Sequence, residues 1–266
     1  MSNRPENQFL ISGDSVGGVT LCSGGRLMIS NWIYRDVSYG EWIIYCNALP
    51  GGQIGHQGKW YRMNPGEAVL IPPYTGFSTQ SSGTFDHFFL HFTAPEPFDR
   101  VKRQLFFFPV TEQLGSLIAL SGKCQSSWRK SFYLKLAAAS VLAQLPESAF
   151  LADQQEVMDS RIKHAVKILE DEFARNPDNP KLARRVGMSL NNFYTLFREE
   201  TGTTPKHYLL NLKLEQSRRE LLYSHKTITG IALDCGFADR YCFSKAFKKF
   251  YGFSPAEYRD KHHPGK

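Results

Sequence analysis

The 266-residue sequence predicts an α+β protein of two domains. Three observations lead to this prediction. Short apolar runs separated by turn residues fill the first hundred positions, a helical unit occurs twice in the last third, and the net positive charge lies with that repeat. We therefore expect an N-terminal β-barrel followed by helices at 1–145, a linker at 146–158, and an all-helical second domain at 159–266.

The first hundred residues are typical of an all-β domain. Apolar or aromatic runs at 27–34, 42–46, 68–71 and 87–92 are separated by clusters of Gly, Pro, Ser and Asn. Many short strands of this kind usually form a sandwich or a barrel, and small barrels commonly enclose a ligand. Residues 105–145 then return to helical spacing, with an apolar stripe from Leu114 to Leu120 and a denser one from Phe132 to Leu142.

The last third of the chain repeats one helical unit. Ala183 and Gly187 recur 49 positions later as Ala232 and Gly236, and five further residues recur 50 positions later. These pairs are Phe193/Phe243, Phe197/Phe247, Gly202/Gly252, Pro205/Pro255 and Tyr208/Tyr258. One residue is therefore added just after the turn glycine. A short helix, a glycine turn and a second helix, made twice, is the pattern of a helix-turn-helix DNA reader.

The second helix of each copy should bury one face and leave the other free. The stripes expected to be buried are Phe193, Leu196 and Phe197 in the first copy and Phe243, Ala246 and Phe247 in the second. The opposite face holds residue types that bind base edges or phosphates. The predicted DNA-binding residues are Asn191, Tyr194, Thr195 and Arg198, followed by Arg240, Tyr241, Ser244 and Lys245.

A helix between the two copies should act as a strut. Thr204-Pro205 and Ser254-Pro255 each place a capping hydroxyl before a proline suited to the first helical turn. The helix from Pro205 to about Tyr223 would be roughly 28 Å long at 1.5 Å per residue. Such a strut would hold the two reading helices about one DNA turn apart, roughly 34 Å, so we expect them to enter successive major grooves.

Charge supports a nucleic-acid partner. Residues 159–266 hold 20 Lys and Arg against 13 Asp and Glu, a net +7, whereas residues 1–158 hold 12 of each. A localised excess of this size is a footprint for a polyanion such as double-stranded DNA. A basic surface that only keeps the protein in solution is the alternative interpretation, and the repeat favours DNA.

The ordered C-terminal motifs resemble a known family. Residues 182–189, 231–237 and 252–259 are similar to the DNA-binding domain of the AraC/XylS family of bacterial transcription regulators, over about 159–259. Residues 64–73 and 88–92 are similar to the cupin-like effector domain of many members. The resemblance implies a transcription activator gated by a small molecule, and a homodimer that forms through the helices at 105–145. Packing of those helices on their own barrel is an equal alternative.

The resemblance also suggests effector-binding residues. Aligned with sugar-responsive members, the chain places Arg35, Thr79, His87 and Phe89 at pocket-lining positions, while Phe77 stands where many relatives have histidine. Arginine and histidine can bind hydroxyls or a carboxylate, and a phenylalanine can stack on a sugar ring. A carbohydrate effector is therefore expected, against the alternative that these are ordinary surface and core residues.

No enzymatic site is expected. His87 and His91 share a face of their strand, but the pair of closely spaced histidines with a glutamate that a metal-binding cupin needs is missing, so we expect no metal and no cofactor. The serines lack a nucleophile elbow, and no phosphate-binding glycine loop is present. Two alternatives stay open: an effector-free DNA-binding dimer, and a metal-binding cupin enzyme fused to a DNA reader.

The remaining features indicate a cytoplasmic location. The polar start, Met1 to Asn7, has no signal-peptide core, and no apolar run is long enough to span a bilayer. The five cysteines are odd in number and widely spaced, so neither a disulfide framework nor a zinc finger is predicted.

Overall fold

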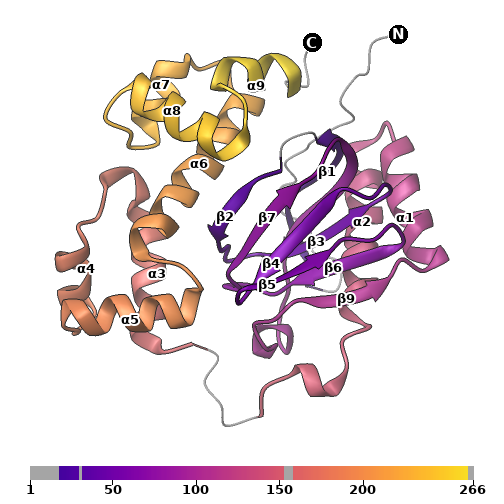
Figure 1. The fold of residues 1–266 in the computed structure, drawn as a ribbon, viewed down its shortest axis with the longest axis horizontal. Helices are drawn as coiled ribbons and strands as arrows, with labels where there is room; N and C mark the ends of the chain where they lie inside the picture. The colour runs from indigo at the N-terminus through magenta and orange to yellow at the C-terminus, as the bar shows by residue number, and fades with distance from the viewer. Residues whose placement is uncertain (1–17, 30–31, 153–157, 263–266) are drawn as a thin grey trace. The chain divides into compact units, whose positions relative to one another are not determined.

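The computed structural model describes residues 18–29, 32–152 and 158–262 (Figure 1). Its contacts divide the chain into two compact units. The first comprises Met1–Asn31, Tyr39–Thr75 and Thr79–Val157, and the second comprises Trp32–Ser38, Gly76–Ser78 and Met158–Lys266. Among the described residues no helix is both long and apolar enough to cross a membrane. The predicted start at Met1 to Asn7 and part of the predicted linker, 153–157, lie outside the described residues.

Within the described residues, nine strands form two sheets, which confirms the prediction of a strand-rich N-terminal domain. The five-stranded sheet has the order β1 (Thr20–Ile29), β8 (Phe85–Thr93), β3 (Trp42–Asn47), β6 (Glu67–Ile71), β9 (Phe106–Pro109). The four-stranded sheet has the order β2 (Tyr34–Val37), β7 (Phe77–Ser81), β4 (Gly52–His56), β5 (Lys59–Arg62). Every neighbouring pair in the larger sheet is antiparallel. The predicted runs at 42–46, 68–71 and 87–92 lie within β3, β6 and β8.

The predicted run at 27–34 was wrong as a single strand. It joins the end of β1 to the start of β2, and β1 begins at Thr20. The apolar run begins only at Leu27, because Ser23, Gly24 and Gly25 before it are residue types that favour turns. In the structure Gly24 pairs with Leu90, and a Cβ on Gly24 would lie 2.7 Å from Cδ1 of Leu90. A side chain at position 24 would have to displace the end of the Leu90 side chain, and the backbone oxygen of Phe89 would lie 3.3 Å from its Cβ.

The two faces of the larger sheet have different environments. Phe88, Leu90 and Phe92 on β8 belong to an apolar core with α1 (Glu112–Lys123) and α2 (Ser127–Leu142). Helix α2 supplies Leu134 and Val141 to this core, so the helices pack on their own domain. Figure 1 shows β4 and β5 on the side of the larger sheet away from α1 and α2. His87, Phe89 and His91 alternate with the core residues and are also buried, at 2%, 8% and 8% exposure.

The helical pattern predicted from residue 105 begins later than expected. Phe106–Pro109 forms β9 and pairs with β6, and α1 begins at Glu112 after its cap, Thr111. Three phenylalanines in a row fit a strand at a sheet edge as well as a helix, and the pairing with β6 decides the outcome. A short helix, η2 (Glu147–Ala149), and an isolated bridge from Val101 to Phe150 follow in the predicted linker.

The second compact unit is mainly helical. Its helices are α3 (Ser160–Glu172), η3 (Phe173–Arg175), α4 (Asn179–Arg185), α5 (Leu190–Thr201), α6 (Pro205–Tyr223), α7 (Ile228–Asp234), α8 (Arg240–Tyr251) and α9 (Pro255–His262). Helices α4 and α5 form the first helix-turn-helix motif, and α7 and α8 form the second. Helix α6 has the predicted bounds. Of the four leucines that the sequence predicts to be buried on it, Leu221 and Leu222 are buried, whereas Leu209 and Leu212 are only half-buried.

The repeat in the sequence is a repeat in the structure. Helices α4 and α7 each have 7 residues, and α5 and α8 each have 12. The turn glycines, Gly187 and Gly236, have φ of 69° and 74°. The added residue lies between turn and cap, because Ser189 caps α5 two positions after its glycine whereas Asp239 caps α8 three positions after. Each copy is therefore the same fold with a slightly longer second turn.

Candidate nucleic-acid interface and effector site

Helices α5 and α8 each bury an aromatic stripe and expose the opposite face. Phe193 and Phe197 of α5, and Phe243 and Phe247 of α8, are each 0% exposed, which confirms the predicted stripes. Leu196 and Ala246, which flank them, are half-buried. Seven of the eight predicted DNA-binding residues are exposed, and Ser244 is half-buried. Two helices therefore present polar side chains of the predicted kind to solvent.

The first reading helix is fixed by a cap and by one side-chain contact. The Ser189 hydroxyl accepts a hydrogen bond from the Asn192 amide at 3.4 Å, which satisfies one of the free N–H groups at the start of α5. Asn179, at the start of α4, donates through Nδ2 to the Tyr194 hydroxyl at 2.9 Å. This bond holds the Tyr194 ring in place while the ring stays 38% exposed. Sequence analysis did not identify Asn179.

The second reading helix has a stronger cap. Asp239 accepts from the Cys242 amide at 2.7 Å, and this bond lowers the pKa of the Asp239 carboxyl. The carboxylate also complements the positive end of the helix dipole. Tyr241, two residues after the cap, is 73% exposed. An aromatic side chain this exposed is available to contact a partner.

The charges on the two reading helices differ. Helix α8 contains Arg240, Lys245, Lys248 and Lys249 and no acidic residue, whereas α5 contains Arg198 together with Glu199 and Glu200. All of these side chains are exposed except Glu200, which is half-buried. The second motif therefore supplies most of the positive charge on the two helices.

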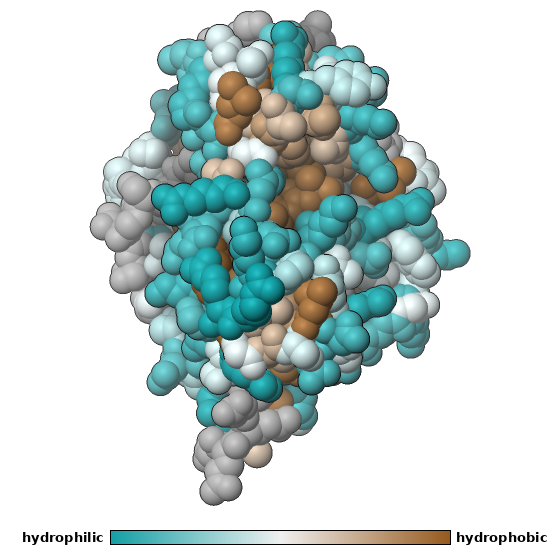
Figure 2. All heavy atoms as spheres, turned by 90° about the vertical axis from the view of Figure 1, so that its left-hand side faces the viewer, coloured by the Kyte–Doolittle hydropathy of each residue, from teal (hydrophilic) through white to brown (hydrophobic). Residues whose placement is uncertain are grey.

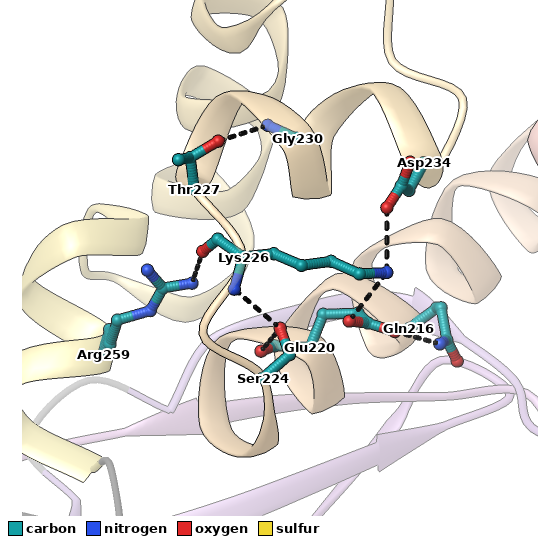
Figure 3. Close-up of polar contacts among 8 residues, drawn as sticks. All are labelled: Gln216, Glu220, Ser224, Lys226, Thr227, Gly230, Asp234 and Arg259. Carbon is teal, nitrogen blue, oxygen red and sulfur yellow. Dashed lines mark hydrogen bonds and ion pairs between the residues drawn. The ribbon is translucent and has the colours of Figure 1, made fainter.

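Lys226 links the second motif to α6 through ion pairs, as Figure 3 shows. Its Nζ lies 3.3 Å from Glu220 Oε2 on α6 and 2.9 Å from Asp234 Oδ2 on α7. Arg259 Nη2 donates to the Lys226 carbonyl oxygen at 2.7 Å, and the Thr227 hydroxyl caps α7 by accepting from the Gly230 amide at 3.0 Å. These contacts join α6, α7 and α9, and so they orient α8 through its own motif.

Hydrophilic residues cover much of the surface seen in Figure 2, which faces the side where α4, α5 and α7 lie in Figure 1. Apolar residues are grouped in separate patches between them. Among the residues of the helix-turn-helix motifs, large exposed apolar side chains include Leu190, Tyr194, Leu233 and Tyr241. Two of these, Tyr194 and Tyr241, are predicted DNA-binding residues, so aromatic rings interleave with the basic side chains.

Two of the predicted effector residues lie together on β8. The rings of His87 and Phe89 are stacked with their centroids 6.2 Å apart, and both are buried on the face away from α1 and α2. Thr79 is buried on β7, at 1% exposure. Arg35 is exposed on β2 and falls in the second compact unit, so the structure does not group it with the other three.

Asn47, which sequence analysis missed, is the polar partner of His87. Oδ1 of Asn47 lies 2.8 Å from Nδ1 of His87, and both residues are buried. Burial, together with the neighbouring His91, lowers the pKa of His87 to about 3, so the ring is neutral near pH 7. Within the described residues, Nδ2 of Asn47 is buried and has no hydrogen-bond partner. A buried donor of this kind is costly unless a ligand or water accepts from it.

His91 shares the face of His87, as the sequence predicted. Its Nδ1 lies 3.1 Å from Oε2 of Glu41, and its ring contacts Tyr39 and Phe89. Among the residues that the structure describes, no three His, Cys, Asp or Glu side chains are grouped so that they could hold a metal ion. His87 therefore has an amide partner, Asn47, and His91 has a carboxylate partner, Glu41.

Known proteins match the C-terminal region of this chain in sequence. Residues 182–261 match the family model of a helix-turn-helix domain. The HTH-type transcriptional activator RhaS of Escherichia fergusonii is 38% identical over 109 residues, which is 41% of this chain and 39% of that protein. RhaS of Mannheimia succiniciproducens is 34% identical over 97 residues, 36% of each chain. The chain spans about two fifths of the length of these curated relatives.

Solved structures match nearly the whole chain in fold. ToxT from Vibrio cholerae has a TM-score of 0.64 at 13% identity, covering 92% of this chain and 99% of ToxT. A second ToxT structure, with bound unsaturated fatty acid, also has a TM-score of 0.64 at 13% identity and covers 94% and 98%. At this identity the likeness shows the fold alone, a sheet-rich domain followed by a helical one.

The fold is therefore a domain of two antiparallel sheets followed by two helix-turn-helix motifs on a shared helix. The C-terminal region is a helix-turn-helix domain similar in sequence to that of the RhaS activators, which agrees with the resemblance found in its motifs.

Proposed function

We propose that this protein is a sequence-specific DNA-binding transcription activator that acts in the cytoplasm as a homodimer and is gated by a small molecule in its N-terminal domain. The observation that supports DNA binding best is the pair of exposed polar faces on α5 and α8, mounted on the two ends of α6. One chain then reads two adjacent segments of major groove. The RhaS relatives are transcriptional activators by name, which supports activation.

DNA binding is tested by selecting duplexes from a random library with the full-length protein. Affinity for a selected duplex and for its scrambled version is then measured by fluorescence anisotropy at several salt concentrations. We expect the selected duplex to bind at least a thousandfold more tightly, which is the usual margin of specific over non-specific binding. Equal affinity for both duplexes would reject sequence-specific recognition.

The effector is proposed to bind the face that contains His87, Phe89 and Asn47. The stacked rings supply an apolar surface, and the Asn47 amide supplies a donor that no described residue satisfies. An uncharged hydroxyl or carbonyl oxygen suits a neutral histidine and an amide, so a carbohydrate is the first candidate. The ToxT structures with an unsaturated fatty acid and with a naphthalenyl butenoic acid make apolar acids the second candidate.

A thermal-shift screen tests the effector. Sugars, sugar acids, fatty acids and aromatic acids are each added to purified protein, since a ligand at 100 times its dissociation constant stabilises a fold by about 2.7 kcal/mol. The variant His87→Ala should lose the shift while keeping its DNA affinity. A shift that survives in His87→Ala would place the ligand elsewhere.

An effector-free regulator is the second candidate. The rings of Tyr45, Phe85, His87, Phe89 and His91 contact one another at centroid distances from 4.8 to 6.4 Å. Mutual packing of this kind fills the face that a ligand would occupy. No shift across the whole panel, with DNA affinity intact, would favour this candidate.

A further inference from the structure

The two helix-turn-helix motifs are joined by a lysine from α6 that neither motif contains. Lys213 is 6% exposed, and its Nζ donates to the carbonyl oxygen of Gly236 at 2.8 Å and to Oδ1 of Asn176. Gly236 is the turn glycine of the second motif, whereas Asn176 precedes α4 of the first motif. One ammonium group therefore binds both halves of the domain.

A second hydrogen bond joins Asn176 to the turn of the second motif without involving Lys213. Nδ2 of Asn176 donates to the Gly236 carbonyl oxygen at 2.9 Å, so this oxygen accepts from both side chains. Asn176 caps η3 with a left-handed backbone, φ 53° and ψ 62°, which asparagine tolerates better than most residues. Lys213 Nζ also lies 5.5 Å from the centre of the Phe237 ring, next to the turn glycine.

Burial makes the junction sensitive to loss of either partner. Desolvation lowers the pKa of Lys213, and it is the main cause of the shift. A buried ammonium without acceptors is strongly unfavourable, so Lys213 is held where the two oxygens meet. Among the residues that the structure describes, the partners of Lys213 are two uncharged oxygens and an aromatic ring, and the neighbouring thiol of Cys235 has the opposite, smaller effect on the pKa.

The turn of the first motif has no such junction. Gly187 has the same left-handed backbone as Gly236, but a Cβ built on it would have no heavy atom within 4 Å. A Cβ on Gly236 would be within 2.8 Å of three backbone atoms of Ala174, the middle residue of η3. Only the second turn is therefore docked on the opposite half of the domain.

We propose that Lys213 is a positioning residue that locks the turn of the second motif onto the η3–Asn176 segment of the first, and so fixes the spacing and orientation of α5 relative to α8. This inference rests on the proposed function for its consequence on DNA. With the lock intact, the two reading helices approach the duplex as one rigid body. A change in the separation of the two base segments then removes one set of contacts, because the helices cannot adjust.

The lock is tested first in the absence of DNA. Nitroxide labels are placed on unnatural amino acids at Glu199 and Lys249 of the full chain, which leaves the native cysteines in place, and the distance distribution is measured by pulsed electron resonance. We expect one narrow distribution for the wild type and for Lys167→Met, which removes an exposed lysine from α3. Lys213→Met and Asn176→Gly should broaden or shift the distribution, and Lys213→Arg should restore it.

Asn176→Gly is the second variant in case Lys213→Met does not fold, because glycine tolerates the left-handed backbone while the side chain that bonds Gly236 and Lys213 is removed. Circular dichroism confirms that each variant is folded. If Lys213→Met does not fold, Asn176→Gly decides the question alone. A distribution in the folded variants as narrow as in the wild type, and at the same distance, overturns the lock.

The second test measures the consequence on DNA. One base pair is inserted between the two contacted segments of a selected duplex. The wild type should lose at least tenfold in affinity, and Lys213→Met should lose distinctly less relative to its own affinity for the original duplex. An equal loss in both proteins would reject the role of the lock in reading. If no duplex can be selected, the proposed function fails, while the label distances still decide the lock.

Discussion

Gly236 packs so closely on Ala174 that a Cβ at position 236 would lie 2.3 Å from the Ala174 carbonyl oxygen. This pair joins a turn of the second helix-turn-helix motif to a segment 62 residues earlier in the chain. The equivalent glycine of the first motif, Gly187, has open space around it. Two glycines with the same role in sequence therefore differ in what tertiary structure demands of them.

We expect Gly236→Ala to destabilise the helical domain more than Gly187→Ala. Both substitutions place alanine at a positive φ, which costs about 1–2 kcal/mol. Only Gly236→Ala adds a clash with backbone, for about 1–3 kcal/mol more. Hydrogen exchange of peptides from 228–251 measures the difference. Equal protection in the two variants would mean that the contact with Ala174 relaxes without cost.

Arg240 should read a base rather than only a phosphate. Arg240→Ala is expected to weaken binding to a selected duplex by about 1–3 kcal/mol and to relax specificity at one base position. Arg175→Ala removes the same charge from an exposed position in η3 and is the matched control. Fluorescence anisotropy on the selected and a random duplex separates the two roles. The same loss on random DNA would make Arg240 a phosphate contact.

The salt dependence of binding should come mainly from α8. Each phosphate contact contributes about 0.9 to the slope of log affinity against log salt concentration. Lys245→Gln and Lys248→Gln are each expected to reduce the slope by about that amount, because both lysines are exposed on a helix without acidic residues. Lys123→Gln, on α1, should leave the slope unchanged. If the α8 substitutions leave the slope unchanged and Arg198→Gln reduces it, then α5 rather than α8 makes most of the phosphate contacts.

Acid should destabilise the N-terminal domain through His87. The folded-state pKa is about 3 and the unfolded value is near 6.5, so the unfolded state binds more protons between these values. Stability is therefore present above pH 6.5 and is lost as pH falls toward 3. The wild type should lose about 2 kcal/mol more than His87→Gln between pH 7.5 and pH 5.

Urea denaturation followed by tryptophan fluorescence measures this loss, since all 4 tryptophans lie in the first 128 residues. Because the other histidines are the same in both proteins, the difference between the two pH profiles isolates His87. Parallel profiles would show that the buried ring takes up a proton at little cost.

The exposed apolar side chains of α1 and α2 should form the dimer contact. Trp128 and Phe132 are 66% and 42% exposed one helical turn apart on α2, and Leu120 on α1 is 43% exposed. Phe132→Glu is expected to convert a dimer to a monomer in sedimentation equilibrium. Trp60→Glu, on β5 and 46% exposed, is the control for loss of an exposed aromatic residue. A dimer that survives Phe132→Glu would place the contact elsewhere.

The helical half of the protein was predictable because its signals are local. Helix bounds at Pro205 and Tyr223, the buried stripes beginning at Phe193 and Phe243, and the turn glycines all follow from spacing and capping within a few residues. A repeat also doubles each signal, so one copy checks the other. The sheet domain was predicted in class but not in detail. Gly24 and Phe106 take their conformation from strands far away in sequence.

The sequence by itself determined the helix-turn-helix class of the C-terminal domain, the order of a sheet-rich and a helical domain, and which faces of α5 and α8 would be buried or exposed. Only the tertiary structure decided that Asn47 is the partner of His87, that Arg35 is exposed, and that Lys213 is buried. Residue type and periodicity report the preferences of a chain segment for apolar or polar surroundings. They do not report which distant segment supplies those surroundings, and for a buried polar group that partner determines both its energy and its role.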